Sequence, residues 1–493
     1  MKRVASGILP VIAVDRKAPK PLHRQIYNVY RTAIVDGSLR PGQRIPSTRV
    51  LASELGVSRS PVLNAYAQLL AEGYFESRVG AGTVVSTSLL SQVTMGAAAR
   101  ARLPATRSGP RTVAHRCSIL PYLERPPWLE GWGAFGVGQV AFDQFPLHLW
   151  SRLVARRCRN MDAKSFHYGG PIGLKSLREA IATYLRTSRS LHCEAEQVMI
   201  VSGSQQALEI SARVLLDPGS HVWIEEPGYG LARDVLALAG CHLVLVPVDK
   251  EGLNVTAGTK LWAKARAALV TPSHQFPLGV TMSASRRFQL LEWAQNTGAW
   301  IIEDDYDSEY RYESSPIASL QGLDANARVI YVGTFSKVLF PSLRLGYVVI
   351  PSDLVDRFLT IRRAIDLGPP SFYQEVLADF IAEGHFARHI RRMRALYRER
   401  RRALVDSITK DLGSQVEVLG DEAGMHLAVA LPNGSLDEKI AERAARQKLW
   451  IWPLSLSYLG RVSRPGFILG FGSSPVEEIP RAVRKLRNLL AEK

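Results

Sequence analysis

Five short apolar runs constrain the fold of this chain more than any other feature. They are VMIV (198–201), HVWI (221–224), AALV (267–270), WII (300–302) and VIYV (329–332), and amphipathic helical segments separate several of them. Continuous apolar runs are typical of strands that are buried on both faces, and their alternation with helices indicates a mostly parallel sheet. From about residue 119 onward we therefore expect an α/β domain, with ligand-binding groups just beyond the C-terminal strand ends.

Polar residues follow each of these runs directly. The five segments are SGSQ (202–205), EEPGY (225–229), TPSHQ (271–275), EDDY (303–306) and GTFSK (333–337). A turn of small residues that opens a helix binds phosphate, because free N–H groups and the helix dipole favour an anion. A lysine amine can form a Schiff base with an aldehyde, and an aspartate can pair with a pyridinium nitrogen. Together these groups predict a site for pyridoxal 5′-phosphate (PLP).

Each of these residues also has a simpler explanation when it is considered alone. Lys337 would be a surface lysine, Tyr229 a packing residue, and the acidic segment 303–305 a solvated loop. The cofactor interpretation depends on all of them lying at strand ends in this order.

Residues ~20–86 carry a different pattern, of three short helices followed by a hairpin. Ser47 and Ser58 are suitable N-caps for the second and third helices. Two β-prone runs, 74–77 and 83–85, flank a glycine-bearing tip at 78–82. The predicted buried positions of the helices are Leu22, Ile26, Val29, Tyr30, Ala33, Ile34, Val50, Leu51, Leu55, Val62, Ala65, Tyr66, Leu69 and Leu70.

Helix, turn, helix and basic hairpin together are typical of a winged helix-turn-helix, whose third helix enters the major groove of DNA by its N-terminal end. Arg59 at that end can form a fork to guanine or clamp a phosphate. The expected DNA contacts are Arg49, Ser58, Arg59, Ser60 and Asn64, with the wing glycines Gly80 and Gly82.

Charge supports the same division of the chain. Residues 1–118 hold 17 Lys and Arg against 5 Asp and Glu, a net charge of +12, whereas the remainder contributes only +5 of the total +17. A basic first quarter indicates a polyanionic partner for that part alone. We predict three parts: a DNA-binding domain at 1–86, a flexible linker at 87–118 rich in small residues and arginine, and the α/β domain at 119–493.

Two family resemblances fit these parts. The run from IPSTRVLA (45–52) through LGVSR (55–59) to GAGT (80–83) resembles the GntR family of bacterial regulators. The segments TPSHQFP (271–277), EDDYDSEYR (303–311) and SK (336–337) resemble fold-type I aminotransferases. The whole chain is thus similar to MocR-type regulators, a GntR subfamily.

This resemblance implies a PLP-dependent transcriptional regulator that senses PLP or an amino compound reacting with it. It also implies a double-stranded DNA operator, a homodimer, arranged head to tail, and a smaller C-terminal α/β subdomain after the mostly parallel sheet. It assigns Lys337 to the PLP aldehyde, Asp304 to the ring nitrogen and Tyr306 to the ring oxygen. The other expected cofactor residues are Tyr229 for stacking, Ser336 beside the lysine, and Ser204, Gln205 and Arg344 around the phosphate.

One position departs from the aminotransferase pattern. Those enzymes place an arginine near the C-terminus for the substrate carboxylate, and here Leu469 falls about where it is expected; Arg461 or Arg464 could substitute. This disfavours turnover of ordinary α-amino acids. The open alternatives are an active aminotransferase with a DNA-binding head and a regulator whose large domain is only a dimerisation scaffold.

The remaining features exclude other classes. No apolar run reaches the ~20 residues that a membrane span needs, and no secretory signal is evident. Four widely spaced cysteines argue against a zinc or disulfide framework and suit the cytoplasm. The arginine-rich segment 388–402 predicts a helix whose outer face is solvated, with a second DNA contact as the alternative.

Overall fold

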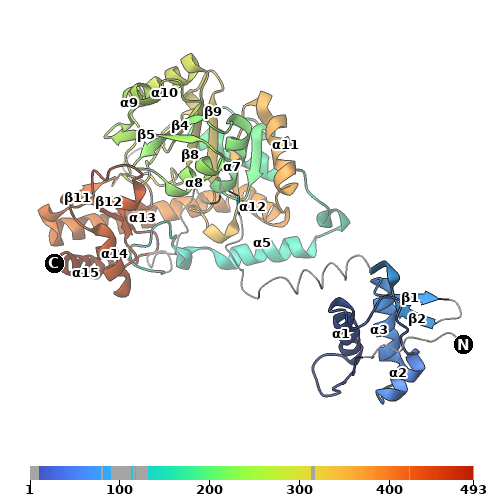
Figure 1. Cartoon of the computed structure of the whole chain (residues 1–493). Coiled ribbons are helices and arrows are strands. Elements are labelled where there is room, and N and C mark those ends of the chain that lie inside the picture. Colours follow the sequence, from blue (N-terminus) through green and yellow to red (C-terminus); the bar gives the residue numbers. More distant parts are fainter. Residues whose placement is uncertain are drawn as a thin grey trace, which may run out of the picture. The chain divides into compact units, whose positions relative to one another are not determined.

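The computed structural model divides the chain into two compact units, residues 1–113 and 114–493 (Figure 1). It describes residues 10–78, 82–89, 113–114, 117, 131–312, 317–420 and 422–491. Most of the predicted linker therefore lies outside the described residues.

The first unit is a three-helix winged fold. Its elements are α1 (Leu22–Val35), α2 (Thr48–Glu54), α3 (Arg59–Ala71) and the antiparallel pair β1 (Phe75–Arg78) and β2 (Gly82–Val85). The core brings together Tyr30, Tyr66 and Phe75, whose ring centroids lie 5.2–5.8 Å apart in edge-to-face pairs. Two predicted core positions are wrong, because Val50 is 50% and Leu70 38% exposed. Both residues lie on the outer faces of their helices.

The second unit is built on an eight-stranded sheet in the order β3-β10-β9-β8-β7-β4-β5-β6. Four of the five predicted runs, β4, β7, β8 and β9, form its parallel block together with β5, whereas the fifth, β3, lies at the edge. A strand that the sequence did not single out, β10, lies antiparallel between β3 and β9. The strands are β3 (Val198–Val201), β4 (His221–Glu226), β5 (His242–Asp249), β6 (Gly252–Leu253), β7 (Ala267–Val270), β8 (Trp300–Asp305), β9 (Val329–Thr334) and β10 (Gly346–Val349).

Helices cover both faces of this sheet (Figure 1). Apolar side chains of α7 (Ser204–Leu215), α8 (Gly230–Leu238) and α11 (Val355–Asp366) pack with Ile224 and Ile302 against one face. The opposite face packs against α6, α12, α9 and α10. The bounds of those helices and of α5 are α5 (Leu147–Arg159), α6 (Lys175–Arg189), α9 (Val255–Trp262), α10 (Ala284–Thr297) and α12 (Phe372–Ala382).

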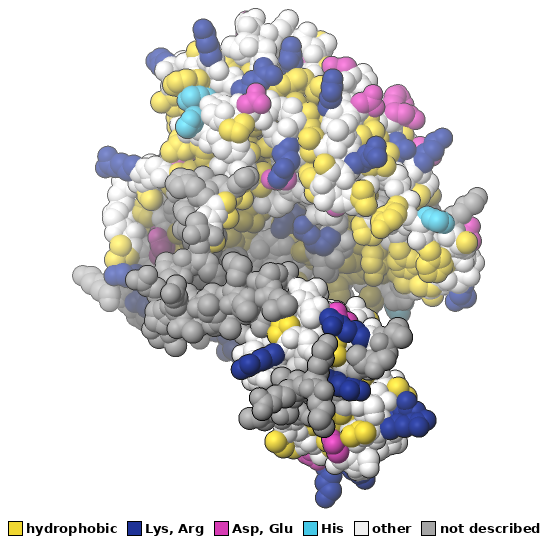
Figure 2. Space-filling view, turned by 45° about the vertical axis from the view of Figure 1, so that its right-hand side comes forward, with side chains coloured by type: hydrophobic (Ala, Val, Ile, Leu, Met, Phe, Trp, Pro, Cys, Tyr) yellow, Lys and Arg dark blue, Asp and Glu magenta, His cyan; other side chains and the backbone are white. Residues whose placement is uncertain are grey.

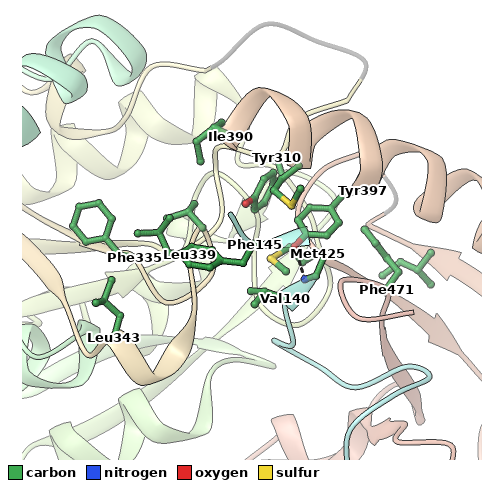
Figure 3. Close-up of a cluster of buried hydrophobic side chains, with 14 of the residues drawn as sticks. Val140, Phe145, Tyr310, Phe335, Leu339, Leu343, Ile390, Tyr397, Met425 and Phe471 are labelled. Carbon is green, nitrogen blue, oxygen red and sulfur yellow. Dashed lines mark hydrogen bonds between the residues drawn. The ribbon is translucent and has the colours of Figure 1, made fainter. Parts of the chain in front are cut away.

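A smaller C-terminal subdomain follows, as predicted. Its antiparallel sheet has the order β11-β12-β14-β13. The helices α13, α14 and α15 belong to the same subdomain. One buried apolar cluster is shared between this subdomain and the large sheet (Figure 3). Its members include Tyr310, Tyr397, Met425 and Phe471. The elements are α13 (His385–Asp411), β11 (Glu417–Leu419), β12 (His426–Ala430), α14 (Asp437–Arg446), β13 (Trp452–Pro453), β14 (Gly466–Gly470) and α15 (Ile479–Ala491).

The arginine-rich segment 388–402 is helical, within α13, but its arginines are not all solvated. Arg394 and Arg398 donate to the carbonyls of Glu309 and Tyr312 at 2.9 Å each, and Arg400 is buried against the carbonyl of Gly472. Arg388, Arg391, Arg392 and Arg402 are exposed, as predicted for the outer face, whereas Arg394, Arg398 and Arg400 tie α13 to neighbouring segments. Among the helices of the described ranges, none is both long and apolar enough to span a membrane.

Candidate functional site: a lysine at the end of a buried strand and an exposed recognition helix

Lys337 lies three residues beyond the end of β9. Its ammonium donates to the carbonyl of Gly138 at 3.4 Å, and a Cβ on Gly138 would come within 2.4 Å of the lysine Nζ. Burial lowers the pKa of Lys337, while the carboxylates of Asp307 and Asp304 raise it. A buried amine with a lowered pKa is a better nucleophile near neutral pH, because more of it is uncharged.

Two adjacent carboxylates at the end of β8 differ in their surroundings. Asp305 Oδ2 accepts from Arg189 (2.9 Å), Ser308 (2.8 Å) and Tyr331. Asp304 points to the opposite face of the strand, and its buried Oδ1 has no donor within the described part of the chain. Burial, then the charge of Asp305, raises the pKa of Asp304 to about 7.

Oxygen Oδ1 of Asp305 also lacks a donor among the described residues, but the guanidinium of Arg189, 2.8 Å from Oδ2, compensates the charge. Asp304 is therefore the carboxylate that needs a partner. A buried carboxylate without a hydrogen bond is costly, so a protonated ring nitrogen at this place would stabilise it.

An anion-binding turn joins β3 to α7. Gly203 is the N-cap residue, with φ of 93°, and Ser204 and Gln205 open the helix with N–H groups that have no partner one turn back. Arg344 donates to the carbonyl of Ser202 at 2.6 Å, and a Cβ on Gly203 would lie 3.3 Å from its guanidinium. The turn, the helix dipole and the guanidinium together form a site for a phosphate.

The two tyrosines that the sequence analysis assigned to the cofactor also follow strands of the sheet. Tyr229 follows β4; burial and then the charge of Asp304 raise the pKa of its hydroxyl, whereas Arg344 lowers it. Its ring centroid lies 5.6 Å from that of Phe276. Tyr306 follows β8 and donates to the carbonyl of His274 at 2.9 Å. Ser336 is half-buried, and its Oγ accepts from Thr334 at 3.1 Å.

The sequence analysis assigned no role to His274, although it quoted the motif that contains it. The ring is 1% exposed, and its Nδ1 lies 3.1 Å from the carboxylate of Asp307. With His426 these residues also form the one group of three potential metal ligands within the described residues. The segment SHQFP (273–277) follows β7, so its place in the sequence could have indicated a functional histidine at a strand end.

The residues that the sequence analysis considered for a substrate carboxylate lie in different surroundings. Leu469, which falls about where the arginine is expected, is buried in the main apolar core. Its neighbour Ile468, on the other face of β14, packs with Phe276, Leu278 and Leu454. Arg461 and Arg464 are exposed, and Arg464 lies 3.5 Å from the carboxylate of Glu417.

The expected DNA-reading residues of the first unit lie at one end of α3. Ser58, Arg59, Ser60 and Asn64 are exposed, as is Arg49 on α2, and Arg59 Nε donates to the hydroxyl of Thr48 at 3.1 Å. Ser47 caps α2, whereas Ser58 makes no capping bond to any described residue. Gly82 starts β2 with φ of 82°, and Gly80 lies outside the described residues.

Arg44 is a further basic side chain that the sequence analysis missed. It is exposed, pairs with Val84 through an isolated bridge, and its guanidinium lies 3.7 Å from the position of a Cβ on Gly82. Basic side chains are visible on both units in Figure 2.

The described residues fit PLP, because they supply a buried carboxylate oxygen without a donor, a half-buried lysine whose pKa is lowered, and an anion-binding turn with an arginine. The fold and the site therefore define a class of protein in which a winged helix-turn-helix is joined to an aminotransferase-type cofactor domain.

Comparisons with known proteins agree on both parts. Residues 22–85 match the family described as bacterial regulatory proteins, gntR family, and residues 132–465 match aminotransferase class I and II. The chain is 39% identical over 97% of its length to the probable rhizopine catabolism regulatory protein MocR of Rhizobium meliloti, 95% of which is covered. It is 32% identical to the pyridoxine biosynthesis regulator PdxR of Corynebacterium glutamicum, with 94% of each chain covered.

The structure of a multiple substrate aminotransferase from Thermococcus profundus matches 78% of this chain and 96% of its own, with 28% identity and a TM-score of 0.69. The chain belongs to the MocR-type transcriptional regulators of the GntR family.

Proposed function

We propose that the protein binds PLP through its large unit and couples that binding, or the reaction of PLP with an amino compound, to operator recognition by its winged helix-turn-helix. In this role Lys337 holds the PLP aldehyde, Asp304 the ring nitrogen and Tyr306 the ring oxygen. Tyr229 stacks on the ring, Ser336 flanks the lysine, and Ser204, Gln205 and Arg344 bind the phosphate. When bound, PLP supplies an electron sink.

The observation that carries this proposal is the buried Oδ1 of Asp304, which has no donor among the described residues. Buried polar groups are nearly always hydrogen-bonded, so such an atom indicates a missing ligand. In a scaffold that binds no cofactor, nothing would offset the cost of an unpaired buried acid, and the lowered pKa of Lys337 would serve no purpose.

A second candidate is an aminotransferase that carries a DNA-binding head, because the lysine, the acid and the anion turn of the site are all present. Leu469 disfavours it for α-amino acids, because it falls about where aminotransferases have the arginine that holds the substrate carboxylate, and a leucine offers no charge.

We further propose a homodimer, with the DNA head of one subunit beside the large unit of the other, acting in the cytoplasm. Support for an interface comes from apolar side chains exposed on the large unit, where Phe142 is 50%, Leu147 55% and Phe166 79% exposed.

The test compares the purified protein with Lys337→Ala, by visible absorption with added PLP and by footprinting on the gene's own upstream region. We expect a visible band in the wild type alone, and a footprint that PLP or its reaction with an amine alters. A colourless wild type that gains no band would refute PLP binding. Rapid transamination without any footprint at low salt would favour the enzyme instead.

A further inference from the structure

His274 lies at the centre of a buried network that the proposed cofactor roles leave unexplained. Its Nδ1 is 3.1 and 3.2 Å from the two carboxylate oxygens of Asp307 and 2.9 Å from the hydroxyl of Tyr306. The carbonyl oxygen of the same histidine is also 2.9 Å from that hydroxyl. One residue therefore contacts Tyr306 through both its ring and its backbone.

The proton positions follow from the chemistry of the partners. An ionised carboxylate only accepts hydrogen bonds, so the Nδ1–H of His274 donates to Asp307. Without cofactor, Tyr306 donates its single hydroxyl proton to the His274 carbonyl. When PLP is bound, the same proton would turn to the ring oxygen, while the Nδ1–H of His274, 2.9 Å from the Tyr306 oxygen, would keep that oxygen in place.

The small subdomain holds the other side of this network. The N–H of Met425 donates to Asp307 Oδ2 at 3.3 Å, and the N–H of Gly424 donates to Tyr310 at 2.7 Å. Gly424 has φ of 74°, and a Cβ on it would lie only 2.0 Å from His274 Cε1. The backbone of the small subdomain thus packs directly against the His274 ring.

We infer that His274 and Asp307 are positioning residues, which together hold the Tyr306 hydroxyl toward the PLP ring and link it to residues 424–425 of the small subdomain. This inference rests on the PLP binding proposed above. It gives the small subdomain a direct contact through which a change at the cofactor ring reaches the rest of the molecule.

Several titratable groups face this network, and a pH experiment has to account for them. Burial raises the pKa of Tyr306 well above its ordinary value, and the nearby carboxylates raise it further. The neighbours from each packed element are Asp304 and Asp305 (β8), Asp307 (after β8), Glu225 (β4), Lys337 (after β9) and His426 (β12).

The test is a double-mutant cycle in the full-length protein, with Tyr306→Phe, His274→Ala and the double variant. Two quantities are measured: the Kd for PLP, and the pH midpoint at which the visible band of the bound cofactor changes. We expect each single variant to raise the Kd roughly 3- to 10-fold, the effect of about one hydrogen bond, and to shift the midpoint in the same direction. The double variant should match Tyr306→Phe within about 2-fold, because both changes remove one shared interaction.

Two controls separate positioning from general structural damage. His274→Asn keeps an amide group near Nδ1 and should restore most of the wild-type midpoint. Tyr397→Phe removes another buried tyrosine hydroxyl, which accepts from Ala141 at 2.9 Å, and should leave the midpoint unchanged.

Additive effects in the cycle, or an unchanged midpoint in His274→Ala, would overturn the inference. If a metal chelator reproduces the His274→Ala spectrum in the wild type, the His274–Asp307–His426 group is a metal site and not a positioning pair. A wild type without any visible band would refute the proposed PLP binding and this inference with it, whereas a normal band without coupling refutes the inference alone.

Discussion

At the scale of single residues, the pKa of Asp304 gives a prediction for stability. The folded, cofactor-free protein holds this proton up to about pH 7, whereas the unfolded chain releases it near the ordinary value of 3.8. Between those values the folded state binds more protons, so the free energy of unfolding decreases as pH rises. We expect cofactor-free Asp304→Asn to be more stable than the wild type at pH 8 and nearly equal at pH 4.

Denaturation curves of both proteins between pH 4 and 8 measure this difference. Asp305→Asn is the matched control, because it breaks the buried pair with Arg189 and should destabilise the protein, by about 3–5 kcal/mol, at neutral pH. A difference between wild type and Asp304→Asn that does not change with pH would contradict the prediction.

The same substitution should weaken cofactor binding. Loss of a charge-assisted hydrogen bond to the ring nitrogen costs about 1.5–3 kcal/mol, or roughly 10- to 100-fold in Kd. A PLP titration of Asp304→Asn at fixed pH, followed by absorption, measures the change. Equal affinity in variant and wild type would mean that another acid holds the ring.

At the scale of elements, the first turn of α3 gives a prediction for DNA binding. Arg59 is exposed there and bonded to Thr48 of α2, so it is held at the groove-facing end of the helix. If Arg59 reads a base, Arg59→Ala should cost about 1–3 kcal/mol on the cognate site and relax the preference at one position. If it contacts only phosphate, binding should weaken on all sequences alike.

Arg24→Ala is a control with the same change in charge. Arg24 lies on α1 and bonds to Gln68 in the C-terminal half of α3 at 3.1 Å, away from the first turn. Binding assays on cognate and scrambled duplexes should show a sequence-dependent loss for Arg59→Ala and only a small, uniform loss for Arg24→Ala. The same loss in both variants would remove Arg59 from the base-reading residues.

At the scale of the whole molecule, the uneven charge predicts that PLP binding and DNA binding belong to different parts of the chain and can be separated. A chain of residues 119–493 should keep the PLP band and lose DNA binding, because the sheet and its helices form their own cores. In the full chain, with six or more phosphate contacts, DNA affinity should fall about 10³-fold or more between 50 and 200 mM salt. Salt-independent DNA binding, or loss of the PLP band in the shorter chain, would contradict this division.

Local patterns in the sequence determined much of this protein. The period of apolar residues predicted α1, α2 and α3, and the five apolar runs predicted β3, β4, β7, β8 and β9. The carboxyl ends of parallel strands meet at one edge of a sheet, and this rule predicted that Lys337, Asp304 and Tyr229 lie at the same edge. Arg344 follows Lys337 by seven residues. The predictions of these helices and strands hold because each depends on residues that are close in sequence.

Only the tertiary structure decided which side chain of a pair faces the site. Side chains alternate across a strand, so Asp304 and Asp305, or Ile468 and Leu469, differ only in which face another element covers. The sequence also missed β10 between β3 and β9, because strand order depends on pairing between distant segments. The role proposed for His274 emerged in the same way: its partner Asp307 lies 33 positions away, and Met425, which donates to Asp307, lies a further 118 positions along the chain. No spacing pattern reports contacts over such distances.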